Sequence, residues 1–153
     1  MMRVERSALL SFTPAHLFAL VQDVARYPEF LPGCVAAHVE EVDGPRVLAN
    51  LRFKFAGMSE SFATENLAVK TADEQLVLQM RLLKGPFKSL LGEWRLQPLG
   101  ESACKVSLAI DLEWGALSLG RLLGPQLERA INNVMQAFKQ RAESLQGVQV
   151  ENH

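Results

Sequence analysis

Few residues of this sequence have the types and spacing that catalysis or metal binding requires. The three histidines are His16, His38 and His153, and none has a cysteine or carboxylate partner at metal-ligand spacing. The two cysteines, Cys34 and Cys104, have no CxxC partner, so we expect both to be buried and unreactive. The chain has no nucleophile elbow, phosphate loop or dinucleotide fingerprint. We therefore predict neither a metal site nor an enzymatic activity.

Two loops carry the other groups that could act on a ligand. Glu29, in a proline-rich loop at residues 27–32, could serve as an acid or base, but no neighbour desolvates it and a solvated carboxylate is favoured. Residues 85–88 form a second loop. Large side chains in these loops either fill the core or line a cavity for an apolar ligand, and composition alone favours the core. Those side chains are Tyr27, Phe30, Leu31 and Phe87.

A long helix near the C-terminus is the element that must cover the rest of the chain. Between Gly115 and Leu145 the apolar residues recur at steps of three and four, which predicts one amphipathic helix. Gly124-Pro125 interrupts the pattern, so we place the helix at residues 124–145 with Pro125 in its first turn. Its apolar stripe, which includes Ile131, Val134 and Met135, must lie against a sheet or groove.

Alternating apolar and polar residues predict the strands of that sheet. Residues 2–10 fit a first strand, Thr13-Pro14 can open a short helix, and residues 23–27 fit a second one. From Cys34 onward, short turns such as Asp43-Gly44-Pro45 separate six further strands. Short turns favour an antiparallel meander, and the alternation favours a sheet with one covered face. The sequence thus predicts an α+β fold.

The strand at residues 59–69 breaks the alternation. Either Phe62, Thr64 and Asn66 face inward, or Ser61, Ala63 and Glu65 do, and both choices place polar groups under the helix. One interpretation is an edge strand, which tolerates polar side chains on its inward face. The other is a set of polar groups that line an internal cavity and orient an apolar guest.

The totals exclude several other classes of protein. The 153 residues fit one domain, which we place at residues 1–146, with residues 147–153 as a disordered tail. The net charge of -1 gives no global basic excess, so we expect no DNA partner. No apolar run approaches the ~20 residues that cross a bilayer, and the N-terminus does not resemble a secretory signal. We expect a cytoplasmic protein, with the periphery of the inner membrane as an alternative location.

Several segments resemble one known family, the coenzyme Q-binding proteins and the bacterial ribosome-association toxins (RatA). The resemblance rests on Asp23 to Cys34, on Gly85 to Leu90 with Gly92 to Leu96, on Ala103 to Val106, and on Met135 to Phe138. It spans about Val4 to Leu145. The family belongs to the START-like, helix-grip superfamily, labelled polyketide cyclase/dehydrase. The resemblance implies a curved seven-stranded antiparallel sheet wrapped around the C-terminal helix, two short helices after strand 1, and a hydrophobic tunnel. Residues 111–117 depart from the family pattern.

We therefore expect a non-enzymatic binding module for a hydrophobic ligand, held between the sheet and the C-terminal helix. The resemblance implies a ubiquinone-type lipid and a role in respiration, with the quinone as ligand and no cofactor. The loop at residues 27–32 is expected to act as a gate, in which Phe30 and Leu31 pack on the helix near Ile131 or Met135. The residues expected to line the pocket are Tyr27, Phe30, Leu31, Phe62, Thr64, Phe87, Trp94, Ile131, Val134 and Met135.

Two alternatives stay open. The first is a RatA-like protein that binds the large ribosomal subunit and blocks subunit joining. Outward basic residues favour it, while Glu93, Asp111 and Glu113 dilute the charge. The second, a polyketide cyclase or aromatase, rests on the superfamily label alone. Expected partners are thus a quinone-like small molecule, a ribosomal subunit, or a membrane surface touched transiently. The basic residues are Arg52, Lys54, Arg81, Lys84, Lys88, Arg95 and Lys105.

Overall fold

The computed structural model describes the backbone of residues 2–55, 57–115 and 119–151, and their side chains apart from those of residues 55, 58, 119–124 and 146–151. The fold is α+β, as the sequence predicted. Its elements, in chain order, are β1 (Met2–Leu10), α1 (Pro14–Gln22), the 3-10 helix η1 (Val24–Glu29), β2 (Cys34–Asp43), β3 (Arg46–Phe55), β4 (Met58–Lys70), β5 (Leu76–Lys84), β6 (Ser89–Pro98), β7 (Cys104–Glu113) and α2 (Leu119–Glu151).

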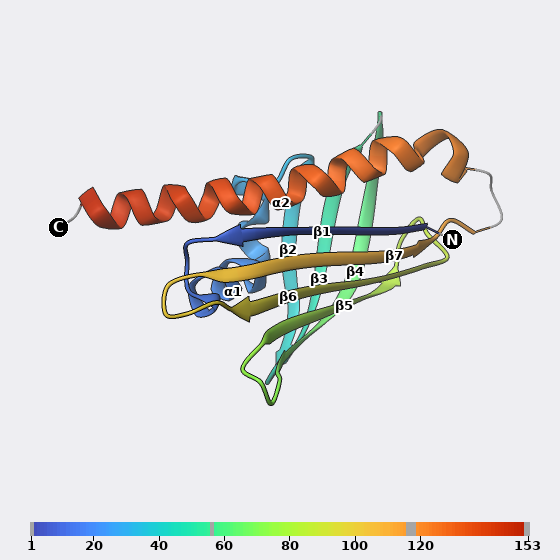
Figure 1. Cartoon of the computed structure of the whole chain (residues 1–153). Helices are drawn as coiled ribbons and strands as arrows, with labels where there is room; N and C mark the ends of the chain where they lie inside the picture. Colours follow the sequence, from blue (N-terminus) through green and yellow to red (C-terminus); the bar gives the residue numbers. More distant parts are fainter. Residues whose placement is uncertain (1, 56, 116–118, 152–153) are drawn as a thin grey trace.

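The strands form one antiparallel sheet in the order β1-β7-β6-β5-β4-β3-β2. Strands β2 to β7 follow one another as a meander, and β1 returns to pair with β7. The sheet curls strongly, so that β2, β3 and β4 cross the direction of β1, β6 and β7, and α2 runs along the side of β1 (Figure 1). This is the START-like, helix-grip architecture that we predicted.

Alternation along the strands separates an inner face, turned toward α2, from an outer face. On the inner face Trp94, Leu96 and Leu108 are no more than 2% exposed. From α2, the stripe at Ile131, Met135 and Phe138 packs against this face and is no more than 5% exposed. Each such side chain contributes about 1.5–3 kcal/mol by leaving water. Burial of one helical stripe therefore holds α2 on the sheet.

The predicted start of α1 is confirmed by its cap. The Thr13 side chain accepts a hydrogen bond from the His16 backbone N–H at 3.3 Å, and Pro14 occupies the first helical position. The next segment, which we predicted as a short helix at residues 23–27, is η1. These two short helices follow β1, as the family resemblance implied.

The edge-strand interpretation of residues 59–69 is wrong. Strand β4 lies inside the sheet, between β3 and β5, and the two edges are β1 and β2. Thr64 and Asn66 face inward and are buried at 9% and 5% exposure. Edge or interior position depends on the pairing of all seven strands, which local alternation does not reveal.

Helix α2 is longer at both ends than the sequence predicted. It begins at Leu119 instead of residue 124, so Pro125 lies inside the helix, where it has no N–H for the carbonyl of residue 121. It also continues to Glu151, past the predicted helix end at residue 145. Extending a formed helix costs little, since nucleation is the expensive step. Of the divergent stretch 111–117, β7 takes the first part, and residues 116 and 117 lie outside the described residues.

Candidate functional site

The loop that follows η1 is fixed by its own backbone. The Leu31 N–H donates to the Tyr27 carbonyl at 2.8 Å, and the Lys54 N–H of β3 donates to the Gly33 carbonyl at 2.8 Å. The buried Tyr27 hydroxyl donates to the Val21 carbonyl. Burial raises the pKa of Tyr27 far above its usual value, so this hydroxyl stays protonated. The loop is thus anchored to α1 and to β3.

Three of the predicted lining residues meet around one residue of α2. The Phe138 ring lies 5.5 Å from Tyr27, 5.1 Å from Phe30 and 4.8 Å from Trp94, between ring centroids and with edge-to-face geometry. Leu31 is buried in the same core. Sequence reasoning placed Phe138 on the helix stripe without a role in the site. Every apolar position of that stripe looks alike in sequence, so nothing marked it as the centre of an aromatic cluster.

A salt bridge and a cation–π contact of Arg141, which together we call the charged clamp, reinforce the packing of Phe30 on α2. The Arg141 guanidinium of α2 lies 2.9 Å from a Glu29 carboxylate oxygen, and its Cζ lies 5.2 Å from the centre of the Phe30 ring. A small cavity of about 180 Å³ opens beside the clamp and is lined by Leu20, Asp23, Arg26, Phe30, Arg141 and Leu145. Phe30 therefore packs on α2 as expected, but at Phe138 and Arg141, farther along the helix than Ile131 and Met135. Whether this loop opens as a gate stays a prediction.

A second line of aromatic rings runs along the other end of the inner face. Phe62 lies 5.7 Å from both Phe53 and Phe87, and Phe87 lies 5.2 Å from Trp114, between ring centroids. Phe62 and Phe87 were predicted lining residues, whereas Phe53 and Trp114 were not. All four are only half-buried. This end of the sheet is thus apolar and still reached by water.

The half-buried apolar side chains continue from these rings toward α2. Ile131 and Met135 are buried, but Val134 beside them is not fully covered. Apolar surface between a sheet and a helix that water still reaches is surface that an apolar ligand could cover, with a gain of about 25 cal/mol per Å². The half-buried inner-face residues, with their neighbours on α2, are Leu51, Phe53, Phe62, Met80, Leu82, Leu90, Ile110, Leu127 and Val134. We call this set the inner lining.

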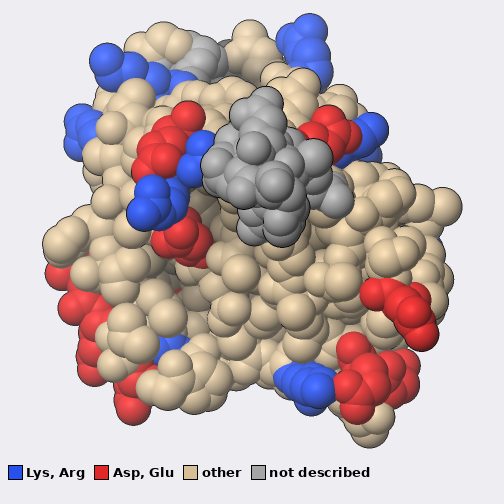
Figure 2. All heavy atoms as spheres, turned by 90° about the vertical axis from the view of Figure 1, so that its left-hand side faces the viewer, with Lys and Arg blue, Asp and Glu red and all other residues tan. Residues whose placement is uncertain are grey.

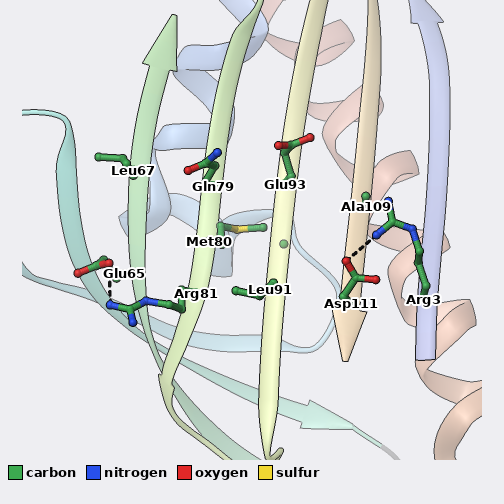
Figure 3. A pocket seen from close by; sticks show the side chains of 11 residues that line it. Arg3, Glu65, Leu67, Gln79, Met80, Arg81, Leu91, Glu93, Ala109 and Asp111 are labelled. Atoms are coloured by element: carbon green, nitrogen blue, oxygen red, sulfur yellow. Dashed lines mark hydrogen bonds and ion pairs between the residues drawn. The ribbon is translucent and has the colours of Figure 1, made fainter. Parts of the chain in front are cut away.

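The outer face of the sheet carries a larger hollow. It has a volume of about 400 Å³, and its side chains come from β1, β4, β5, β6 and β7 on the side turned away from the helices (Figure 3). Arg81 and Arg46 both pair with Glu65, at 3.0 and 2.8 Å. These two arginines hold the pKa of Glu65 below its usual value. Sequence reasoning did not predict this hollow.

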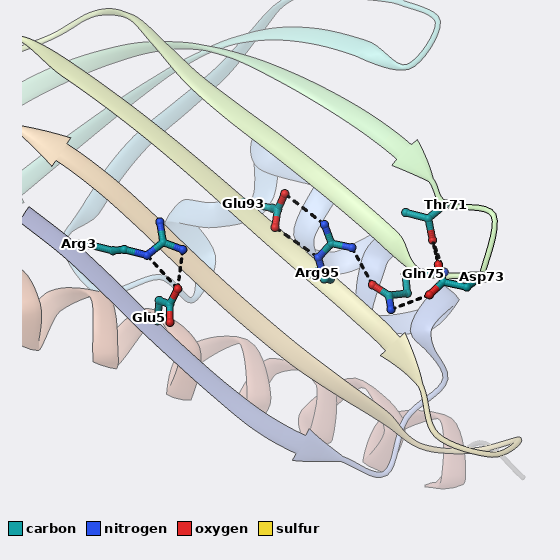
Figure 4. A network of polar contacts seen from close by, with 7 residues as sticks. All are labelled: Arg3, Glu5, Thr71, Asp73, Gln75, Glu93 and Arg95. Atoms are coloured by element: carbon teal, nitrogen blue, oxygen red, sulfur yellow. Dashed lines mark hydrogen bonds and ion pairs between the residues drawn. The ribbon is translucent and has the colours of Figure 1, made fainter.

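Ion pairs neutralise much of the basic surface that the sequence predicted. Arg95 contacts Glu93 at 3.3 Å and donates to Gln75 at 2.7 Å, within a network that reaches the turn after β4 (Figure 4). Lys88 lies 3.7 Å from Glu113. On the surface seen from the C-terminal end of α2, acidic and basic side chains both occur around the rim, with wide uncharged areas between them (Figure 2). Acidic partners beside Arg81, Lys88 and Arg95 therefore give the outer face a mixed charge.

The two cysteines are buried, as predicted. Burial raises the pKa of the Cys104 thiol to about 11 and also raises that of Cys34, so both stay protonated near neutral pH. Within the described residues, no three histidine, cysteine or acidic side chains gather to hold a metal ion. No helix in the described part of the chain has the length and apolarity needed to cross a membrane.

Comparison with known families and curated proteins yields consistent matches. Residues 10–139 match the family described as polyketide cyclase/dehydrase and lipid transport. The chain is 39% identical to the ribosome association toxin RatA of Vibrio cholerae, over 96% of this chain and 99% of that protein. It is 40% identical to RatA of Pseudomonas aeruginosa, over 94% and 97%. The mitochondrial coenzyme Q-binding protein coq10 of Schizosaccharomyces pombe is 26% identical, over 95% and 90%.

Solved structures agree on the fold. An aromatase/cyclase, Zhui from Streptomyces sp. R1128, superposes with a TM-score of 0.81 at 19% identity and covers 93% of each chain. An 18 kDa protein from Caulobacter crescentus superposes with a TM-score of 0.75 at 33% identity, over 96% of this chain and 99% of that one. At 19% identity, the likeness to the aromatase/cyclase extends to the fold alone.

Proposed function

Because the chain belongs to the polyketide cyclase/dehydrase and lipid transport family, and within it to the group of the ribosome association toxin RatA, we propose that it binds an apolar ligand on its inner lining, beneath α2. The proposed ligand is a ubiquinone-type lipid, bound without chemical change and in support of respiration. In this proposal the protein works in the cytoplasm and takes up its ligand during transient contact with a membrane surface.

The observation that carries this proposal is the incomplete burial of the inner lining. Phe53 and Phe62 of this set, with Phe87 beside them, lie along one end of the sheet with apolar rings that water still reaches. A flexible isoprenoid-like tail offers matching apolar surface, and its burial would drive association. The name of the coq10 relative, a coenzyme Q-binding protein, supports the choice of a quinone head.

The loop after η1 lies at one end of the proposed ligand site. Phe30 contacts Phe138 and Arg141 of α2, and the cavity of about 180 Å³ adjoins it. The loop is short, and Pro28 in η1 and Pro32 in the loop restrict the unfolded conformations of this segment, so closing the loop costs little entropy. We propose that it closes one end of the ligand chamber.

Freshly purified full-length protein tests the proposal directly. Native mass spectrometry and lipid extraction should reveal a bound quinone or a related lipid in repeated preparations. The same extraction from a helical protein of similar size, purified from the same cells, is the control for carry-over of membrane lipid. Equal lipid content in both samples would count against the proposal.

Association with a ribosomal subunit is the second candidate. The names of relatives at 39% and 40% identity favour it, and the outer hollow, which shares Met80 with the inner lining, opens on the side of the sheet turned away from the helices. Cosedimentation with separated subunits at several salt concentrations tests it. Binding that weakens steeply with salt would indicate contacts with RNA phosphates, and absence of binding at low salt would remove this candidate.

A further inference from the structure

One buried side chain of the inner face lacks a hydrogen-bond partner. Asn66 lies in β4 between Val47 of β3 and Met80 of β5, and it is 5% exposed. Its Oδ1 is fully buried and accepts no hydrogen bond from any described residue. Polar groups buried in native proteins nearly always have partners, so an unpaired one calls for an explanation.

The choice of asparagine at this position works against stability. Strands disfavour asparagine, and an unpaired buried amide loses its hydrogen bonds to water without replacement. A leucine at the same place would fit the apolar inner face better. A trapped water or a polar group of a bound molecule would supply the missing hydrogen bond.

The space beside Asn66 is filled by one flexible side chain. In register beyond Met80 lies Gly92 of β6, which is buried and has no side chain. The space that a Cβ at Gly92 would take is occupied by the Met80 methyl, whose Cε lies 2.6 Å from that point. Methionine is unbranched and flexible, so this methyl can move aside. Beyond Gly92 comes Ile110 of β7, which is half-buried.

We infer that Asn66 is the polar contact of the ligand chamber and that it hydrogen-bonds an oxygen on a flat head group, which lies over Met80 and Gly92. The inference rests on the proposed function. An amide donates through its NH₂ and accepts through its oxygen, and it can turn either one toward the ligand. The buried oxygen can accept from the hydroxyl of a quinol, and after the amide turns over its NH₂ can donate to the carbonyl of a quinone. Apolar molecules without such an oxygen gain nothing from it.

Two probes separate this inference from simple apolar binding. Decylubiquinone has oxygens on its ring, and its binding is followed by quenching of tryptophan fluorescence. Diphenylhexatriene is apolar, has no oxygen, and becomes fluorescent when bound. The Asn66→Leu variant should bind decylubiquinone about tenfold more weakly, as expected for the loss of ~1.4 kcal/mol, and should bind diphenylhexatriene as the wild type does. Its melting temperature should be equal or higher.

The matched control is Asn50→Leu, which makes the same substitution on the outer face of β3, where the Asn50 amide donates to Glu40, and should alter neither affinity. If Asn66→Leu does not fold, Asn66→Ser shortens the side chain and should show the same selectivity. Loss of both probes in equal measure, or of neither, would overturn the role of Asn66. A wild-type protein that binds neither probe would overturn the proposed function itself.

Discussion

The ring of Phe30 meets the ring of Phe138 edge to face, with centroids 5.1 Å apart and planes at 82°. This contact joins the loop after η1 to α2, which is more than 100 residues away in sequence. Such aromatic pairs contribute about 0.5–1.5 kcal/mol beyond the area that they bury. The contact therefore holds the loop after η1 against the helix that covers the sheet.

Replacing either ring should separate a closing loop from plain core. Phe138 is 5% exposed at the centre of the cluster, so Phe138→Ala should cost about 3–5 kcal/mol of unfolding free energy. Phe30 is only half-buried, and Phe30→Ala should cost less than about 2 kcal/mol while it weakens decylubiquinone binding about tenfold. Urea unfolding and fluorescence titration measure the two effects. A large stability loss with unchanged affinity for Phe30→Ala would show that the loop is structural only.

A methyl group at Gly92 should compete with the ligand for space. Gly92→Ala places a Cβ 2.6 Å from the present position of the Met80 Cε, so the methionine must shift toward the chamber. We expect decylubiquinone affinity to fall and the double variant Gly92→Ala, Met80→Ala to recover it, because the shorter side chain restores the room. Fluorescence titrations of both variants and of Met80→Ala alone complete the double-mutant cycle. Unchanged affinity in Gly92→Ala would place the head group elsewhere.

Alkaline pH should destabilise the fold through Cys104. Its folded pKa is raised from 9.0 to about 11, so the stability it contributes is present below pH 9 and is lost as the pH rises toward 11. A pKa rise of this size corresponds to about 3 kcal/mol. Urea midpoints at pH 8 and 10.5 should therefore fall less in Cys104→Ala than in the wild type. Equal falls in both proteins would assign the loss to other groups, such as Tyr27.

Protonation of the Glu65 carboxylate should lower the stability of the fold in acid. Arg46 and Arg81 lower its folded pKa, so its contribution is present above the usual value of 4.5 and is lost as the pH falls from there through the folded pKa. Glu65→Gln should reduce stability at pH 7 and flatten the loss between pH 5 and pH 3. The control is Glu60→Gln on the same strand, since Glu60 has no ion pair among the described side chains. Identical acid profiles for both variants would contradict this role.

Much of the architecture could be predicted because one face of the sheet is covered. The alternation in Cys104–Glu113 and the stripe at Ile131, Met135 and Phe138 each follow from burial on one side only. The position of β4 could not be predicted, since both phases of its sequence place polar residues inward. Pairing with β3 and β5 decides that Thr64 and Asn66 face the helix.

The site itself was predicted only in its parts. Tyr27, Phe30 and Trp94 were identified as large apolar side chains, but their meeting at Phe138 depends on how α2 lies across the sheet. The outer ion pairs depend on strand register in the same way. Glu65 meets Arg46 from 19 residues away and Arg81 from 16, and no local pattern links them.

Titration of the full-length protein with decylubiquinone tests the central claim most directly. The inner lining should take up the quinone saturably at one site, quench tryptophan fluorescence and raise the melting temperature. At a ligand concentration of 100 times Kd the added stability is about 2.7 kcal/mol, which corresponds to a rise of about 5–10 °C for a domain of this size. Unchanged fluorescence and melting temperature, in protein shown to be free of bound lipid, would contradict the claim that this fold binds a quinone.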